Sequence, residues 1–107
     1  MPVNSRKKTD RNVRKVIELL QSRYGADHPG AVIEAYRYNP SSIRIRIIDS
    51  DFRGLGRIER DNIVWPILES LPEDIRSDIT ALLLVTPEEK PDSLMNQEFD
   101  DPSPSRL

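Results

Sequence analysis

The chain has no cysteine and a single histidine, and these two scarcities exclude several kinds of chemistry. Without thiols there are no disulfides, no thiol nucleophiles and no thiolate metal ligands. With His28 alone, no usual zinc site can be assembled, and we expect an exposed loop histidine there. No apolar run reaches the roughly eighteen residues that a membrane span requires, and residues 1–8 lack the apolar stretch of a secretory signal. We therefore expect no membrane segment and a cytoplasmic protein.

Sequence motifs of catalysis and metal binding are absent as well. The chain contains no nucleophile elbow, phosphate-binding loop or metalloprotease motif. The stretch from Asp49 through Asp51 to Gly54 begins like a calcium loop, but Arg53 and Arg60 then stand at its fifth and twelfth positions, where oxygen ligands are needed. The sequence therefore predicts a non-enzymatic protein with no metal and no cofactor.

Charge is abundant in the chain and unevenly distributed. Of the 107 residues, 32% are charged and the mean hydropathy is -0.58, which suits one soluble domain with a modest core. Residues 1–60 hold thirteen Lys/Arg and seven Asp/Glu, a net of +6, whereas residues 61–107 hold three and eleven, a net of -8. Halves of opposite charge can attract each other or different partners.

Composition further divides the chain into three regions. We expect a disordered basic arm over residues 1–9, a folded domain over residues 10–90, and an acidic, proline-containing tail over residues 91–107 that is mostly extended or disordered.

Apolar periodicity predicts six elements within the folded domain. Residues at helical spacing indicate a first helix that ends near Tyr24, with Thr9 or Asp10 as its cap. Alternating patterns indicate two strands, and a nearly all-apolar run indicates a third that is covered on both faces. Pro66 is expected to kink or break the second helix. The remaining elements are strands 31–38 and 42–49, a helix over 58–71, a short helical turn over 72–75 and a last strand over 79–85.

The register of the first two strands follows from charge. If Tyr38 lies opposite Ser42, then Glu34 falls opposite Arg46 and Tyr36 opposite Arg44. A slip by one residue would turn every side chain to the other face, place like charges together and bury a carboxylate, so we expect the first arrangement. The last strand is linked through helices and should lie parallel to strand 42–49.

A spaced pattern between Phe52 and Glu89 resembles the BolA family. It comprises an F-x-G turn, a helix with a basic residue and an aliphatic–aromatic pair, and a strand that ends in threonine. The residues are Phe52-Arg53-Gly54, Arg60, Ile63-Val64-Trp65, Leu68, Ile79 to Thr86 and Glu89. The resemblance covers about residues 10–90. It implies an α+β fold of BolA-like αββααβ order, related to type II KH topology, with a three-stranded mixed sheet and helices packed on one face; periodicity predicts the same order.

The resemblance also implies partners, namely monothiol glutaredoxins with a bridging iron–sulfur cluster that a histidine ligates. In this chain Thr80 stands at the matching strand position, and Arg60-Asp61 stands where the family has a basic residue and a histidine. A hydroxyl does not replace imidazole as an iron ligand, so we do not expect the cluster role. Docking of a protein partner on the same surface remains an expectation.

Two binding hypotheses follow from the sheet. The first is single-stranded nucleic acid on the outward face, because aromatic side chains interleaved with arginines stack on bases and meet phosphates. The alternative for the same residues is cross-strand pairing that serves solubility. The proposed nucleic-acid residues are Tyr36, Tyr38, Arg44 and Arg46, with Arg37 at the hairpin end and the arm Arg6-Lys7-Lys8 free to reach across.

The second hypothesis is a protein–protein adaptor that uses the last strand or the tail. Leu82 and Leu84 are expected on the open face with Thr80, and such leucines are seldom left in water. We therefore expect a cover, which is either a second molecule or the tail through Leu94, Met95 and Phe99. If the tail is the cover, its acidic residues Glu98, Asp100 and Asp101 would lie against Arg44 and Arg46 and imitate a polyanion. Trp65 is expected to pack in the core.

Overall fold

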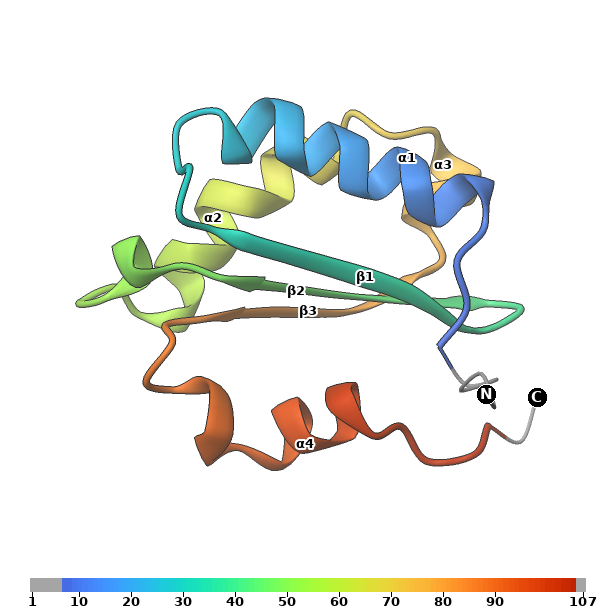
Figure 1. The fold of residues 1–107 in the computed structure, drawn as a ribbon. Helices are drawn as coiled ribbons and strands as arrows, with labels where there is room; N and C mark the ends of the chain where they lie inside the picture. Colours follow the sequence, from blue (N-terminus) through green and yellow to red (C-terminus); the bar gives the residue numbers. More distant parts are fainter. Residues whose placement is uncertain (1–6, 106–107) are drawn as a thin grey trace.

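A three-stranded sheet forms the middle layer of the structure, a computed structural model that describes residues 7–105 (Figure 1). Its strands are β1 (Val32–Asn39), β2 (Ser42–Ile48) and β3 (Ile79–Val85), in the spatial order β1-β2-β3. β1 and β2 run antiparallel, and β2 and β3 run parallel. The predicted mixed sheet and the predicted αββααβ order of the domain are confirmed.

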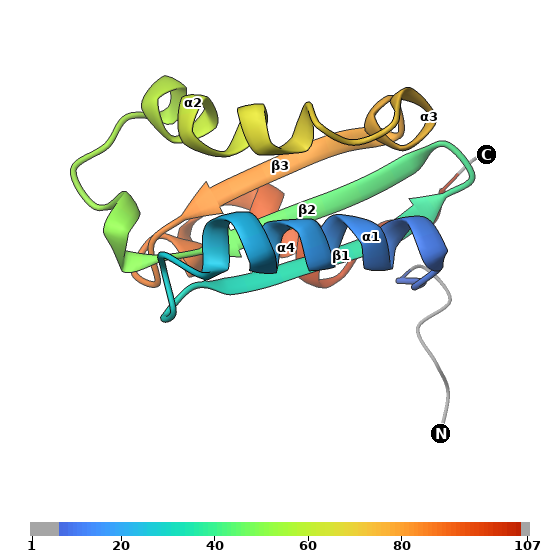
Figure 2. The ribbon, with the colours of Figure 1, turned by 90° about the horizontal axis from the view of Figure 1, so that it is seen from above.

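Helices lie on both faces of this sheet, as Figures 1 and 2 show. One face carries α1 (Arg11–Leu20), which continues as the π-helical segment η1 (Gln21–Gly25), together with α2 (Arg57–Leu68) and α3 (Glu73–Arg76). Seen from above, α1 lies over β1 and β2, and α2 lies on the β3 side (Figure 2). The other face carries α4 (Leu94–Asp100); the 3₁₀ segments η2 (Ser50–Phe52) and η3 (Lys90–Asp92) are short connections. No described helix is long and apolar enough to cross a membrane.

Local signals explain where the first two helices begin and end. Asp10 caps α1, its carboxylate accepting a hydrogen bond from the Val13 backbone N–H at 2.8 Å. The helical stretch then ends at Gly25, as expected. Pro66 does not break α2, which continues to Leu68; the proline removes only the hydrogen bond to the carbonyl of Asn62, an exposed residue that water can reach.

The F-x-G turn between β2 and α2 also has a physical basis. Phe52 is 1% exposed and anchors the turn in the core. Gly54 has a φ of 84°, in the left-handed region that side chains other than glycine seldom adopt.

The apolar core lies between the sheet and the first three helices. The β2 isoleucines Ile43, Ile45 and Ile47 are fully buried there, and Ile33 and Ala35 of β1 pack against the same cluster. Each buried isoleucine contributes roughly 1.5–3 kcal/mol of hydrophobic free energy. This face holds the domain together.

The predicted register is confirmed for most of the hairpin. Glu34 pairs with Arg46 and Tyr36 with Arg44. At the turn Ser42 pairs with Asn39 instead of Tyr38, because one extra residue is accommodated there. Tyr38 nevertheless packs with the cluster of Tyr36 on the α4 side of the sheet.

The prediction for the faces of β3 is wrong. Leu82 and Leu84 face the apolar core on the helix side, whereas Leu83 packs against the α4 side. The reason is an irregularity: Ile43 pairs with Ile79, but Arg44 already pairs with Ala81, so Thr80 is an extra residue in β3. An inserted residue reverses the alternation of all later side chains.

The tail also differs from expectation, since residues 94–100 form a helix where an extended or disordered segment was predicted. The Ser93 hydroxyl accepts a hydrogen bond from the Asn96 backbone N–H at 3.1 Å and so caps α4. Residues 1–6 of the predicted basic arm lie outside the described part of the chain. Lys8, from the same predicted arm, exchanges two backbone hydrogen bonds with Arg37 at the outer edge of β1.

Candidate functional site

The structure brings together four of the five predicted nucleic-acid residues, on the face of the sheet that α4 covers. We call Tyr36, Tyr38, Arg44 and Arg46 the arginine–tyrosine face. The Arg46 guanidinium is fully buried and donates to Glu34 at 2.8 Å and to Asp100 of the tail at 2.7 Å. It also lies over the ring of Phe99, 4.4 Å from its centre.

Arg44 and the tyrosines of this face make further contacts with the tail. Arg44 donates to the Glu98 carboxylate at 3.0 Å, and its guanidinium lies 3.6 Å from the ring centre of Tyr38. The Tyr36 hydroxyl donates to the Phe99 carbonyl at 2.8 Å, and the rings of these two residues lie 4.8 Å apart. Phe99 is 3% exposed, so it is the apolar anchor of the tail.

The charges on this face are matched in pairs. The hydrogen bond from Arg46 holds the pKa of Asp100 below its ordinary value. The pKa of Glu98 is lowered first by the Ser103 backbone N–H and further by Arg44. Both carboxylates are therefore ionised at neutral pH. The tail occupies the arginine–tyrosine face with anions and one aromatic ring.

The fifth predicted residue, Arg37, lies elsewhere. Its guanidinium pairs with Asp10 at the cap of α1 and with Asp78 at 3.2 Å, on the helix side of the sheet. Of the basic arm, the Lys7 ammonium lies 5.6 Å from the ring centre of Tyr36, and Arg6 falls outside the described residues. The predicted nucleic-acid surface therefore lacks Arg37 and is smaller than expected.

A second candidate surface lies along the outer edge of β3. Arg60 of α2 donates to the Leu84 carbonyl at 3.0 Å, so this carbonyl points away from β2. Because backbone groups alternate along a strand, those of Leu82 also point to this edge. Within residues 7–105 no strand pairs with it, since β3 is the last strand of the sheet.

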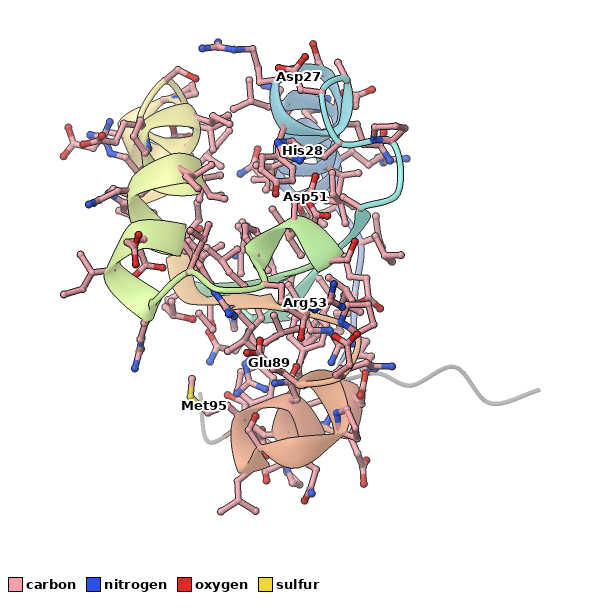
Figure 3. All side chains as sticks on the ribbon, turned by 90° about the vertical axis from the view of Figure 1, so that its left-hand side faces the viewer. Asp27, His28, Asp51, Arg53, Glu89 and Met95 are labelled. Carbon is pink, nitrogen blue, oxygen red and sulfur yellow. The ribbon has the colours of Figure 1, made fainter. Side chains whose placement is uncertain are left out.

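A groove follows this edge between α2 and α4. We call it the edge groove and define it by Arg57, Asp61, Trp65, Thr80, Leu82 and Met95, which line three adjoining hollows of the surface. Met95 is 52% exposed and projects from α4 on the side of the molecule where α2 lies (Figure 3). Trp65 packs against the core, as expected, and its remaining surface lines the groove.

One end of the groove is held by an ion pair between α2 and the segment after β3. Arg60 donates to the two carboxylate oxygens of Glu89 at 2.6 Å and 3.1 Å. Chiefly through these bonds, the pKa of Glu89 falls to about 2. Glu89 also accepts a hydrogen bond from the Thr86 backbone N–H at 2.9 Å. The end of the groove is therefore fixed at neutral pH.

Of the predicted partner-binding residues, Leu82 belongs to the edge groove as defined. Leu84 and Phe99 also line the hollows that form it, but both are buried, at 8% and 3% exposed. Sequence reasoning missed Arg57, Asp61 and the role of Met95. One signal was present, because a last strand placed beside strand 42–49 leaves its own outer edge without a neighbour.

Comparisons with known proteins identify no family for the chain. No family model and no curated protein sequence matches the chain. Among solved structures, the chain is similar to BolA1 from Arabidopsis thaliana, with 21% sequence identity, a TM-score of 0.48, and coverage of 76% of this chain and 98% of that chain. A likeness of this size shows no family for the chain, and we take neither a fold assignment nor a functional residue from it.

Proposed function

We propose that the protein is a small, non-enzymatic binding module that captures an extended segment of a protein partner along the outer edge of β3. The observation that carries this proposal is a strand edge that no other strand of residues 7–105 pairs with, beside an exposed apolar side chain, Met95. As an adaptor of this kind it requires no iron–sulfur ligand, which agrees with Thr80 at the position of the family's histidine. Its cytoplasmic location stays a prediction.

The backbone of β3 selects an extended ligand. Edge N–H and C=O groups are met in full only by another strand, whose groups recur at the same spacing. The Leu84 carbonyl already accepts a hydrogen bond from Arg60, so the part of the β3 edge that can pair with a ligand lies toward Thr80 and Leu82. A short segment of a few residues therefore fits.

The residues that line the groove determine which side chains are favoured in the bound segment. Alternate side chains of an added strand point to opposite faces, here toward α4 and toward α2. The α4 side offers the exposed Met95, which suits an apolar residue. The α2 side offers Arg57, which is exposed and forms no ion pair within the described residues, so it suits an acidic residue. The expected ligand is an extended segment with apolar and acidic residues in alternation.

A peptide selection tests this proposal directly. A random nonapeptide library is selected against the immobilised full chain, and the affinity of a recovered peptide is measured for variants. Met95→Asp should weaken binding strongly, because it places a charge on the apolar wall. The matched control is Ile58→Asp, which changes an exposed apolar residue of α2 (75% exposed) that does not line the groove. Equal affinity of the two variants, or a library without binders, contradicts the proposal.

A second candidate function is the binding of single-stranded nucleic acid on the arginine–tyrosine face after α4 has left it. The observation that favours it is the nature of the present occupant: two carboxylates meet Arg44 and Arg46, and the Phe99 ring packs at a tilt against the ring of Tyr36. Phosphates offer the negative charge that these carboxylates supply, and bases offer flat rings as Phe99 does.

Two variants test the second candidate. A chain truncated after Lys90, and the full chain with Glu98→Gln and Asp100→Asn together, should bind an oligothymidine with an affinity that falls as salt rises. The control is Glu88→Gln, because Glu88 is exposed and pairs with Arg53 away from this face. Absence of binding by both variants removes this candidate and leaves the first untouched.

A further inference from the structure

His28, Asp49 and Asp51 come together at the end of the molecule formed by the loop after η1 and by η2. Figure 3 shows His28 and Asp51 there. The His28 Nδ1 atom lies 2.7 Å from the Asp51 Oδ2 atom and 3.2 Å from the Asp49 Oδ2 atom. The three atoms all lie within 4.8 Å of one another. The sequence predicted an exposed, uninvolved histidine here, and the structure shows instead a histidine in contact with two carboxylates.

A neighbouring tyrosine holds two of these groups in place. The His28 ring stacks on the Tyr24 ring, with centres 4.1 Å apart and planes 7° apart. The Tyr24 hydroxyl donates to Asp49 Oδ2 at 2.5 Å. Outer partners that orient the ligating groups in this way are typical of metal sites.

The charge of the cluster is a separate observation. Asp49 is 4% exposed, and burial of a carboxylate is costly unless a cation or several hydrogen bonds compensate it. Several other carboxylates of the described chain have arginine partners, such as Asp10 with Arg37 and Glu89 with Arg60. Asp49 and Asp51 form ion pairs with no lysine or arginine among the described residues; the basic side chain beside them is His28. The two carboxylates therefore lack a full positive partner.

We infer that His28, Asp49 and Asp51 bind a divalent transition-metal ion through one nitrogen and two oxygens. In a tetrahedral site, bonds of about 2.0 to 2.2 Å from such an ion place neighbouring ligand atoms about 3.3 to 3.6 Å apart. The distance of 3.2 Å is close to this spacing, and the atoms that are now 2.7 Å apart move apart slightly when an ion enters. A mixed nitrogen and oxygen set suits Zn²⁺ better than Ca²⁺, and the exposed side of Asp51 leaves room for water to complete the coordination.

The chemistry of binding is an exchange of cations. Coordination needs a free electron pair on the His28 Nδ1 atom, so any proton that this atom carries leaves to solvent when the ion binds. The site uses no residue of the edge groove and none of the arginine–tyrosine face. It therefore stands or falls independently of the proposed function.

Titration of the full chain with ZnCl₂, followed by calorimetry and by NMR, tests this inference. We expect saturable binding of one ion per chain, with shifts of the His28 and Tyr24 ring signals. His28→Gln and Asp51→Asn should abolish saturable binding. Tyr24→Phe keeps the stacked ring but removes the hydroxyl, so it should weaken binding without abolishing it. The matched control is Asp27→Asn, which removes an exposed carboxylate next to His28 that is not part of the cluster.

Circular dichroism of each variant establishes that it is folded. Asp49→Asn is avoided because Asp49 is buried and anchors Tyr24. Absence of saturable zinc binding by the natural sequence overturns the inference. So does an affinity that His28→Gln and Asp51→Asn leave unchanged.

Discussion

The two faces of the sheet are closed by different forces. On the helix side, three β2 isoleucines are fully buried among apolar residues of α1 and α2. On the α4 side, closure combines one aromatic anchor, Phe99, with ion pairs of Arg44 and Arg46 to the tail. Both faces exclude water, but by unlike chemistry.

This difference indicates which part of the molecule can detach while the rest stays folded. Hydrophobic burial is insensitive to salt and acid, whereas pairs of arginine and carboxylate weaken when salt screens them or acid neutralises the carboxylate. The tail is linked to the sheet through the segment after β3. We therefore expect α4 to leave the sheet under conditions in which the rest of the domain stays folded.

The largest loss of stability is expected from a mutation in the apolar core on the helix side of the sheet. Ile45→Ala leaves a cavity in a fully buried site, and such changes cost about 2–5 kcal/mol. Urea denaturation followed by circular dichroism should show this loss as one cooperative transition at lower urea. A stable variant with an unchanged midpoint would contradict the assignment of the core to this face.

A smaller and local effect is expected from Phe99→Ala. The side chain is the buried anchor of α4, but undocking of the tail limits the loss of stability to at most about 3 kcal/mol. Hydrogen exchange should quicken over residues 94–100 and remain slow in β2. Equal loss of protection in both segments would mean that the tail and the domain unfold as one unit.

Acid should release α4 from the sheet while the helix side stays folded, and this requires no mutation. The folded-state pKa values of Glu98 and Asp100 lie below their ordinary values of 4.5 and 3.8. Their contribution is therefore complete above these ordinary values and is lost as the pH falls through the lower folded values. NMR signals of the Phe99 and Tyr36 rings should move toward random-coil positions below about pH 4, while those of Ile45 keep their native shifts. Simultaneous loss of all three would refute the separation.

The smallest effect is expected outside both faces. Ile58 is 75% exposed on α2, so Ile58→Ser should change the free energy of unfolding by no more than about 0.5 kcal/mol. The same urea experiment measures it. A loss comparable with that of Ile45→Ala would show that this exposed position takes part in an unrecognised contact.

Local patterns were sufficient to predict most of the domain. The alternation of isoleucine and arginine in β2 defined both faces of the sheet, because a strand has a period of two residues. The directions of the β3 side chains were predicted wrongly because the extra residue at Thr80 reverses their alternation. A run of leucines has no polar residue that could indicate which side chains face the core. α4 was missed although Ser93 is a good cap, because the tail around it is acidic and contains prolines, a composition typical of extended or disordered segments.

The candidate sites depend on contacts between distant segments and were harder to predict. His28 meets Asp51 across 23 positions of the chain, and Arg46 meets Asp100 across 54. Charge complementarity suggested the second contact, because the tail is acidic and the strand basic. No local pattern suggested the first, which arises from the way Tyr24 stacks on His28 at the end of the helical stretch.

Hydrogen exchange of the full chain, with and without a selected peptide, tests the central claim most directly. If the peptide adds a strand to β3, exchange of the outward Leu82 amide slows markedly, and residues 94–100 keep their protection. If the Leu82 amide is unaffected while residues 94–100 lose protection, the peptide has displaced α4 from the arginine–tyrosine face, and the edge of β3 is not the binding site.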